Sequence, residues 1–336
     1  MTVMGVPVAF AARLAGCLAC AWAIIAGPAP AAAQGFPSRP VTIVVPFAAG
    51  GTTDILARVV ADRMKTALGQ PVVIENVPGA SGALAVGRVV RAAPDGYTIS
   101  IGNWGTHVVN GAVQRLPYDL LGDLAPLAVL PGNPYLVFSN ADVSAKNLGE
   151  LIAWLKAHPD AATAGTGGPG SAIHIAGVFF EEKTGTRFRF VPYRGGTPPA
   201  VQDLLAGHID LLFAQPTDVL PQMASGKVRA YAVMADHRIA QAPDIPTVDE
   251  AGAPGLYVST WYGFWLPHGT PKPAVDKLSA AVMDALADPV VRSRLADLGL
   301  EIPPSAQQTP EALGRFHKSE IEKWWPIIRA ADIKVE

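Results

Sequence analysis

Two glycine-rich stretches are the parts of this sequence best suited to chemistry, and that chemistry is the binding of an anion. Gly50-Gly51-Thr52-Thr53-Asp54 follows the apolar run VTIVVPF of residues 41–47 and leads into a helical pattern. The first N–H groups of a helix lack partners within the helix, and the helix dipole adds partial positive charge there. Glycine lets a ligand approach the backbone closely, and threonine hydroxyls add neutral donors. The stretch therefore suits a carboxylate, although a simple capping role for Thr53 or Asp54 explains the same residues.

A second stretch of the same kind lies further along the chain. TAGTGGPGSAIHIAGVFF, which begins at residue 163, runs from a short strand pattern through small residues into an amphipathic helix. The first stretch lacks the lysine of a Walker loop and is not a G-x-G-x-x-G motif. Two such helix starts facing one ligand would hold a carboxylate without lysine or arginine.

Ser171 and His174 in the second stretch raise the alternative of a nucleophile and its base. The surroundings are not G-x-S-x-G, no orienting carboxylate is evident, and a spacing of three residues at one helix start is poor geometry for a triad. No His, Cys or carboxylate cluster has the spacing of a metal site. We therefore predict no enzyme, no metal and no cofactor.

Alternating strand and helix patterns position these stretches. The first series comprises VTIVVPF, a helix that stops at Gly69, PVVIEN, a helix from about 82 to 91, and YTISIGN. The second series begins after residue 135 with YLVFSN, NLGELIAWLKAH, ATAGTG, a helix near 172–183, FRFVPY, a helix near 198–206, HIDLLFA and VRAYAVMA. Such alternation predicts two α/β lobes with parallel-rich sheets, followed by a helical C-terminal tail, and parallel sheets bind ligands at the carboxyl ends of their strands.

The N-terminus is typical of a secretory signal peptide. An uncharged apolar segment over residues 14–30 follows Arg13 and precedes three alanines, which predicts cleavage near Ala33 and export to the periplasm. Both cysteines, Cys17 and Cys20, lie inside residues 1–33, so the mature chain has no disulfide. Leu-Ala-Gly-Cys at residues 14–17 resembles a lipobox, but most of the apolar region follows Cys17, which disfavours a lipid anchor there.

Charge and hydropathy exclude two classes of partner. The 336 residues carry a net charge of −2, so no basic surface for nucleic acid is expected. No second apolar run approaches the roughly 18 residues that span a membrane. We expect an exported monomer.

Eight motifs together resemble the solute-binding proteins of tripartite tricarboxylate transporters, the Bug family. These motifs are RPVTIVVPFAAGGTTDILAR, ENVPGASG, AAPDGYT, LPYD, GTGGPGSAIH, VPYRGGTPPAVQDLLAGHID, PDIPTVDEAG and WYGFWLPHGTP. The resemblance covers essentially the whole mature chain in the family's order. It implies a type II periplasmic binding protein fold, a Venus flytrap that closes on a small organic acid. It also implies a membrane partner with a large and a small integral subunit.

The resemblance also implies the site residues. The ligand's carboxylate would be held, partly through ordered water, by the first stretch at Phe47, Ala48, Ala49, Gly50, Gly51, Thr52 and Asp54, and by the second at Thr166, Gly167, Gly168, Ser171 and His174. The walls of the cleft would come from Asn103, Trp104, Thr106, Tyr193 and Gly195. For Asp54, pairing with Arg58 is the competing role, and for His174 it is support of the scaffold.

Two departures from the family pattern bear on the ligand. Ala214 stands where the family often has an aspartate, which disfavours an amino acid. Trp104 replaces small polar residues and would offer a flat face to an aromatic ligand, unless it packs in the core.

These observations predict a protein that captures a dicarboxylate or an aromatic carboxylate and delivers it to the transporter. We expect one lobe from 34–136 plus 260–336, a second from 137–259, and hinges near Asn133-Pro134 and Thr260-Trp261. The alternatives are a ligand sensor that signals to a membrane kinase and, more remotely, a hydrolase that uses Ser171 and His174.

Overall fold

The computed structural model describes residues 35–193, 197–331 and 333, and the chain divides into the units Met1–Ser38 and Arg39–Glu336. The predicted signal peptide, residues 1–33, lies outside the described residues. The fold and the site described below belong to the second unit.

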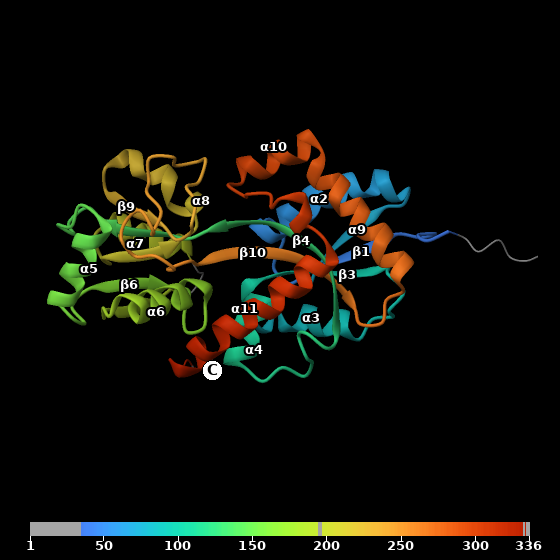
Figure 1. Ribbon diagram of the computed structural model, residues 1–336, viewed down its shortest axis with the longest axis horizontal. Coiled ribbons are helices and arrows are strands. Elements are labelled where there is room, and N and C mark those ends of the chain that lie inside the picture. Colours follow the sequence, from blue (N-terminus) through green and yellow to red (C-terminus); the bar gives the residue numbers. More distant parts are fainter. Residues whose placement is uncertain (1–34, 194–196, 332, 334–336) are drawn as a thin grey trace, which may run out of the picture. The chain divides into compact units, whose positions relative to one another are not determined.

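The first of two five-stranded sheets has the strand order β2-β1-β3-β10-β4 (Figure 1). Its strands are β1 (Val41–Val45), β2 (Val72–Asn76), β3 (Thr98–Asn103), β4 (Leu124–Pro134) and β10 (Ser259–Pro267). β1 pairs in parallel with β2 and β3, whereas β10 runs antiparallel between β3 and β4. The continuous apolar sequence of β1 suits this place, because helices cover both faces of the sheet.

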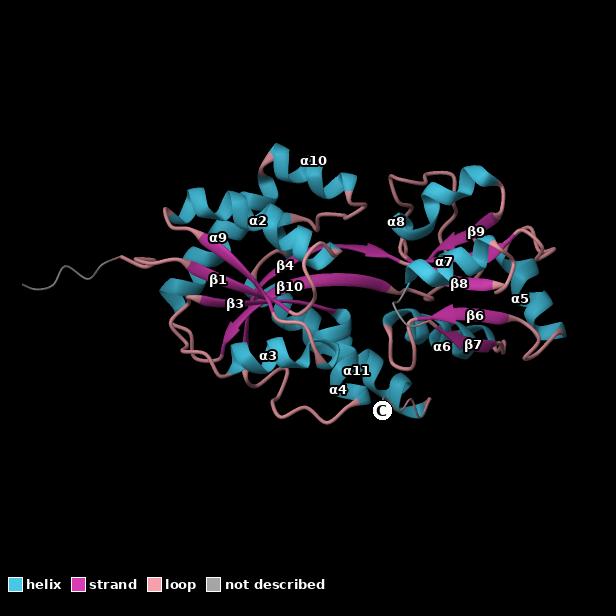
Figure 2. Ribbon diagram, turned by 180° about the vertical axis from the view of Figure 1, so that it is seen from behind, coloured by secondary structure: helices cyan, strands magenta, loops and turns pink. Residues whose placement is uncertain are grey.

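Helices on the two sides of the first sheet come from distant parts of the chain. Figures 1 and 2 show α2, α9 and α10 on one side and α3, α4 and α11 on the other. Their bounds are α2 (Thr52–Leu68), α3 (Ala83–Val90), α4 (Asn110–Val113), α9 (Lys272–Ala287), α10 (Pro289–Asp297) and α11 (Pro310–Ala330). Shorter turns are the 3₁₀ helices η1 (Ala80–Gly82) and η4 (Ser305–Gln307), and the π-helix η2 (Gly105–Val109).

The second sheet repeats the plan of the first, with the order β7-β6-β8-β5-β9. Its strands are β5 (Leu136–Asn140), β6 (Thr163–Thr166), β7 (Arg189–Pro192), β8 (Leu211–Ala214) and β9 (Val228–Val233). β6 is parallel to β7 and β8, and β5 is antiparallel to β8 and β9. The accompanying helices are α5 (Leu148–Ala157), α6 (Ala172–Thr184), α7 (Thr197–Leu205), α8 (Pro216–Val219) and the 3₁₀ helix η3 (Leu220–Ser225). The two-lobed α/β fold with a helical C-terminal end is thus confirmed.

Backbone hydrogen bonds join the two places where the chain passes between the sheets. β4 ends at Pro134 and β5 begins at Leu136, while the return passage ends where β10 begins at Ser259. Tyr135 donates its N–H to the carbonyl of Val258 at 2.9 Å and accepts from Met234 at 2.8 Å. The passages therefore lie side by side, within a few residues of the predicted hinges. The lobe boundaries at 136/137 and 259/260 stay predictions.

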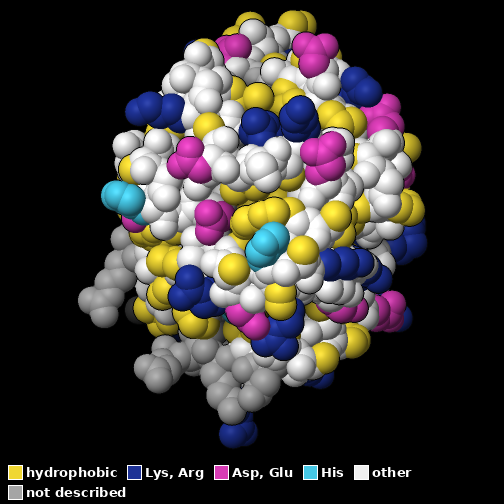
Figure 3. All heavy atoms as spheres, turned by 90° about the vertical axis from the view of Figure 1, so that its left-hand side faces the viewer, with side chains coloured by type: hydrophobic (Ala, Val, Ile, Leu, Met, Phe, Trp, Pro, Cys, Tyr) yellow, Lys and Arg dark blue, Asp and Glu magenta, His cyan; other side chains and the backbone are white. Residues whose placement is uncertain are grey.

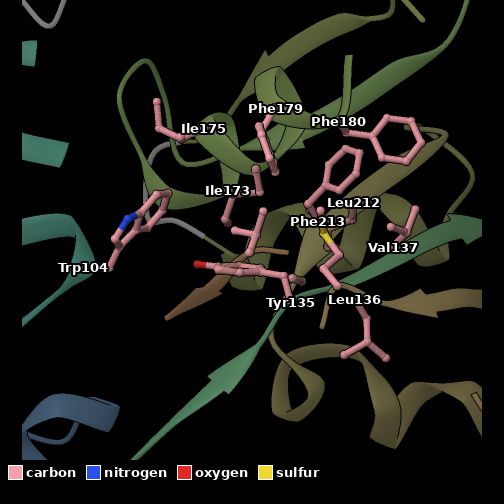
Figure 4. Close-up of a cluster of buried hydrophobic side chains, with 14 of the residues drawn as sticks. Trp104, Tyr135, Leu136, Val137, Ile173, Ile175, Phe179, Phe180, Leu212 and Phe213 are labelled. Carbon is pink, nitrogen blue, oxygen red and sulfur yellow. The ribbon is translucent and has the colours of Figure 1, made fainter. Parts of the chain in front are cut away.

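Aromatic and branched side chains fill the core around the second sheet. Figure 4 shows Phe179, Phe180, Leu212 and Phe213 in this core, and all four are buried. Phe180 and Phe213 contact at 5.2 Å between ring centroids. Trp324 of α11 meets both Phe179 of α6 and Trp104 edge to face, at 4.9 and 4.8 Å. The final helix is thereby tied to both lobes.

The surface carries both signs of charge. Figure 3 views the end of the molecule that carries α5, and Lys, Arg, Asp and Glu side chains are interspersed over it. This face has no extended basic patch of the kind that binds nucleic acid. No helix among the described residues is long and apolar enough to cross a membrane.

Two strands of the first sheet were not expected from the alternation of patterns. β4 has the sequence LAPLAVLPGNP, in which three prolines argue against a strand. β10 lies between the second series of predicted elements and the helical tail, where no strand is predicted. β10 is buried along almost all of its length because it pairs on both sides. These antiparallel strands complete the sheet that the parallel units begin.

The close approach of β4 and β10 gives the first testable prediction. A Cβ atom at Gly132 would lie 2.5 Å from the carbonyl oxygen of Thr260 and 2.9 Å from Cα of Trp261, which are backbone atoms. We expect Gly132→Ala to destabilise the protein by about 1–3 kcal/mol because the strands must separate. Chemical denaturation measures the difference. The matched control is Gly122→Ala, whose Cβ atom would make only ordinary van der Waals contacts with Asp119. Equal stability of the two variants would show that the strands can separate at no cost in free energy.

Candidate functional site

A pocket of about 320 Å³ is lined by residues from both lobes. The first lobe contributes Phe47, Ser81, Asn103, Gly105, Thr106, Asn110, Val113, Gln114 and Thr260, and the second contributes Gly167, Pro169, Gly170, Ser171 and Ala172. Asn103 ends β3, and Gly167 directly follows β6. The pocket thus lies at the carboxyl ends of parallel strands in both sheets, which is where such sheets bind ligands.

Hydrogen bonds within the second glycine-rich stretch hold it in place. Gly168 and Gly170 have positive φ angles, of 101° and 75°. The Ser171 hydroxyl oxygen caps α6 by accepting from the N–H of His174, and Gly170 donates its N–H to Nδ1 of His174 at 3.2 Å. Because Ser171 uses only an acceptor site in the cap, its O–H group remains available to a ligand.

His174 supports this stretch from the side. Its ring packs edge to face against Phe190 at 4.5 Å, and burial lowers its pKa. The neutral ring suits the acceptor role of Nδ1 toward Gly170. Among the described residues, no hydrogen bond joins the Ser171 hydroxyl to the His174 ring, so the nucleophile-and-base alternative has no support.

Asn103 and Thr106 form a reciprocal pair at the end of β3. The N–H of Asn103 donates to Oγ1 of Thr106, and the N–H of Thr106 donates to Oδ1 of Asn103, both at 3.0 Å. The Thr106 hydroxyl also lies 2.9 Å from Nδ1 of the buried His107. These bonds consume Oδ1 of Asn103, and within the described chain its Nδ2 has no partner. Asn103 therefore offers a donor to the pocket.

The first glycine-rich stretch differs from the expectation. Only Phe47 of that stretch lines the pocket; Ala48, Ala49, Gly50 and Gly51 are exposed, Thr52 is half-buried, and Asp54 is buried beneath them. These six residues therefore do not line the pocket, and their contact with a ligand stays a prediction.

Asp54 instead supports the stretch through a buried hydrogen-bond network. It accepts from the N–H of Gly50 at 2.8 Å, from Nδ2 of Asn76 at 2.9 Å, and from two nitrogens of Arg58 at 2.9 and 3.0 Å. The Arg58 guanidinium, helped by Gly50 and Asn76, outweighs burial and lowers the pKa of Asp54 to about 2. The structure therefore shows Asp54 paired with Arg58, which was the alternative to a contact with the ligand.

Trp104 requires a correction. Its side chain is 0 % exposed and packs on Trp324, so it presents no flat face to the pocket. A large ring that follows a buried strand gains more from the core than from a solvated cleft.

Five other expected residues of the described chain also lie away from the pocket lining, namely Thr166, Gly168, His174, Tyr193 and Ala214. The Tyr193 hydroxyl donates to Asp203 at 2.6 Å, and Ala214 is fully buried at the end of β8. Thr166 is buried, and its hydroxyl oxygen accepts from the N–H of Gly168 within the same loop. Gly195 lies outside the described residues. The predicted residues that reach the pocket are Phe47, Asn103, Thr106, Gly167 and Ser171.

Several pocket residues were missed. Ser81 belongs to the quoted motif ENVPGASG, in which residues 79–82 all have positive φ angles, and two of the four are not glycine. Such backbone strain is concentrated at functional sites. Asn110 and Gln114 lie one turn apart around α4, a helix too short to be read from a sequence pattern. The remaining missed residues are Gly105, Val113, Pro169, Gly170, Ala172 and Thr260.

The described lining of the pocket contains no ionised side chain. Backbone N–H groups at a helix start bind anions without a charged side chain. Here such donors come from the first turn of α6, and the Ser171 and Asn103 side chains add two more. Among the described residues, no group of three His, Cys, Asp or Glu side chains could hold a metal ion.

The Asp54 network gives a prediction about pH. Because the folded pKa of Asp54 is depressed from 3.8 to about 2, its stabilisation is fully present above the unfolded value and is lost as the pH falls through about 2. We expect Asp54→Asn to cost about 1–2 kcal/mol at pH 7, with allowance for screening of the half-exposed Arg58. Unfolding measured from pH 7 to pH 2 should show this cost shrinking below pH 4. Arg58→Met should show the same trend, and a cost independent of pH would contradict the assignment.

Comparisons with known proteins agree with this geometry. A family model described as the tripartite tricarboxylate transporter family receptor matches residues 56–333. The protein BugT of Bordetella pertussis is 32% identical over 310 residues, which cover 92% of this chain and 94% of BugT. MatC from Rhodopseudomonas palustris, solved with bound malate, is 39% identical with a TM-score of 0.74, over 87% of this chain and 100% of MatC. Another R. palustris protein, solved with adipate, is 32% identical with a TM-score of 0.75, over 89% and 99% of the two chains. On the fold, the placement of the pocket and these matches, the chain belongs to the family of tripartite tricarboxylate transporter receptors.

Proposed function

We propose that this receptor captures a small dicarboxylate in the pocket between its lobes and delivers it to a membrane transporter with a large and a small integral subunit. Members of the family are receptors and not enzymes. The proposal places the mature protein in the periplasm, as a monomer, after cleavage near Ala33. The observation that carries it is a pocket at the carboxyl ends of parallel strands whose described lining is uncharged and offers donors from both lobes.

The ligand class follows from the size and the polarity of the pocket. A volume of about 320 Å³ suits a small acid, and polar side chains are present in both lobes. The aromatic alternative rested on Trp104, whose burial removes that argument. The relatives solved with malate and adipate support a dicarboxylate.

Closure of the lobes would complete the site. Ser171 and Gly167 belong to the second lobe, whereas Asn103 belongs to the first, so a ligand that bridges them favours the closed form. Exclusion of water strengthens each neutral hydrogen bond to the carboxylate. The hinge would lie at Tyr135 and Ser259, where the chain passes between the sheets.

A ligand screen tests this function. Protein that has been stripped of ligand by unfolding and refolding is heated with C4 to C6 dicarboxylates, benzoate, amino acids and sugars. A ligand at 100 times its Kd adds about 2.7 kcal/mol of stability, which raises the melting temperature measurably. We expect dicarboxylates to give the largest rise. A rise confined to sugars or amines would overturn the proposal.

Ser171 should contribute to affinity as well as to stability. We expect Ser171→Ala to weaken dicarboxylate binding about tenfold in calorimetry, because the hydroxyl is a donor facing a charged group, and to cost about 1 kcal/mol through the lost cap. Asn147→Ala is the matched control, because Asn147 caps α5 in the same way and does not line the pocket. The control should lose stability alone. If both variants bind with the affinity of the wild type, Ser171 is only a cap.

A further inference from the structure

Asn110 places a hydrogen-bond acceptor with a fixed orientation in a pocket otherwise rich in donors. Its side chain is 5% exposed and lines the pocket. Nδ2 donates to the carbonyl oxygen of Ser81 at 2.9 Å. Reversing the amide would set two oxygens against each other, so Oδ1 must be the atom on the other side. No donor among the described residues reaches that oxygen.

The partner of Asn110 is itself held firmly. Ser81 lies within the segment 79–82, where every φ angle is positive. A Cβ atom at Gly82 would lie 2.6 Å from Cγ2 of Thr106 and 3.0 Å from Cβ of Pro46, so this segment is packed closely against its neighbours. Asn110 is also the first residue of α4, directly after the π-helix. Both ends of the Asn110–Ser81 bond are therefore fixed, and the amide has no alternative partner to turn toward.

The other polar side chains of the pocket are donors or already have partners. Ser171 and Asn103 present donors, and the Thr106 hydroxyl is used within its own turn. Thr260 donates to the Tyr135 hydroxyl at 3.0 Å and accepts from Gln215. The Gln114 side chain makes no hydrogen bond within the described chain, and its amide can turn to present a donor or an acceptor. A simple diacid satisfies the donors but leaves Oδ1 of Asn110 desolvated and unpaired.

We propose that the ligand is a hydroxy-carboxylate whose hydroxyl group donates to Oδ1 of Asn110. This inference rests on the proposed capture of a carboxylate and adds the group that distinguishes one acid from another. An ammonium group is a second possible donor, but a buried ammonium requires a carboxylate partner, and none of the described lining residues supplies one. A hydroxyl group needs only the one acceptor.

The test compares two ligands that differ by a single hydroxyl group. Calorimetry measures the Kd of the wild-type protein for succinate and for each enantiomer of 2-hydroxysuccinate. We expect one enantiomer to bind at least tenfold more tightly than succinate, because succinate leaves the acceptor without a partner. This comparison requires no variant and so does not depend on how a substitution affects folding.

Two variants then locate the preference at Asn110. Asn110→Leu and Asn110→Asp both lose the donor to Ser81, but only Asn110→Asp keeps an acceptor oxygen. We expect the preference for the hydroxylated ligand to disappear in Asn110→Leu and to persist in Asn110→Asp, even if the overall affinity falls in both. Asn147→Leu, at a helix cap that does not line the pocket, should leave the preference unchanged.

The outcomes separate this inference from the proposed function. Binding of succinate and both hydroxylated enantiomers with equal affinity overturns the inference and leaves the capture of a dicarboxylate intact. A preference that survives in Asn110→Leu, or tighter binding of aspartate than of 2-hydroxysuccinate, also overturns it. If no carboxylate binds the wild type, the proposed function itself fails.

Discussion

The antiparallel pairing of β4 with β10 is the contact on which the rest of this structure depends. These two strands complete the first sheet, and at their ends the chain passes to and from the second sheet. The passages are hydrogen-bonded through Tyr135, Val258 and Met234. Because both connections lie together, the chain crosses between the lobes at one place, and residues from each lobe can line a single pocket. Thr260 at the start of β10 is itself part of that lining.

Neutral recognition sets the character of the pocket. An ion pair between buried groups must repay the cost of removing two charges from water, whereas backbone N–H groups and hydroxyls are already oriented by the fold. The few hydrogen-bond acceptors in the pocket indicate what else the ligand carries, because a carboxylate has no proton to donate to them. Asn110 is notable for this reason: the backbone of Ser81 fixes which of its two polar atoms faces the ligand.

Ionisable residues act one layer behind the pocket. Asp54 holds the first glycine-rich stretch through Gly50 and is held in turn by Arg58, while His174 holds Gly170 in the second stretch. Both side chains fix loop geometry, and the described lining of the pocket in front of them consists of neutral groups. The buried pair of Trp104 and Trp324 has a comparable role on a larger scale, because it fastens the C-terminal helix against the first lobe.

The sequence by itself determined the alternation of strands and helices, the family and the two glycine-rich helix starts, because these depend on local periodicity and on short motifs. It also indicated Ser171, at a glycine-rich helix start, and Asn103, at the end of a predicted strand. Only the tertiary structure decided that Trp104 is core, that Asp54 pairs with Arg58 beneath its loop, and that Asn110 and Ser81 meet across 29 residues of chain. A side chain beside a loop can point toward solvent, a ligand or the interior with the same local sequence. The choice among them depends on packing against α11, β10 and the opposite lobe, which are distant in the chain.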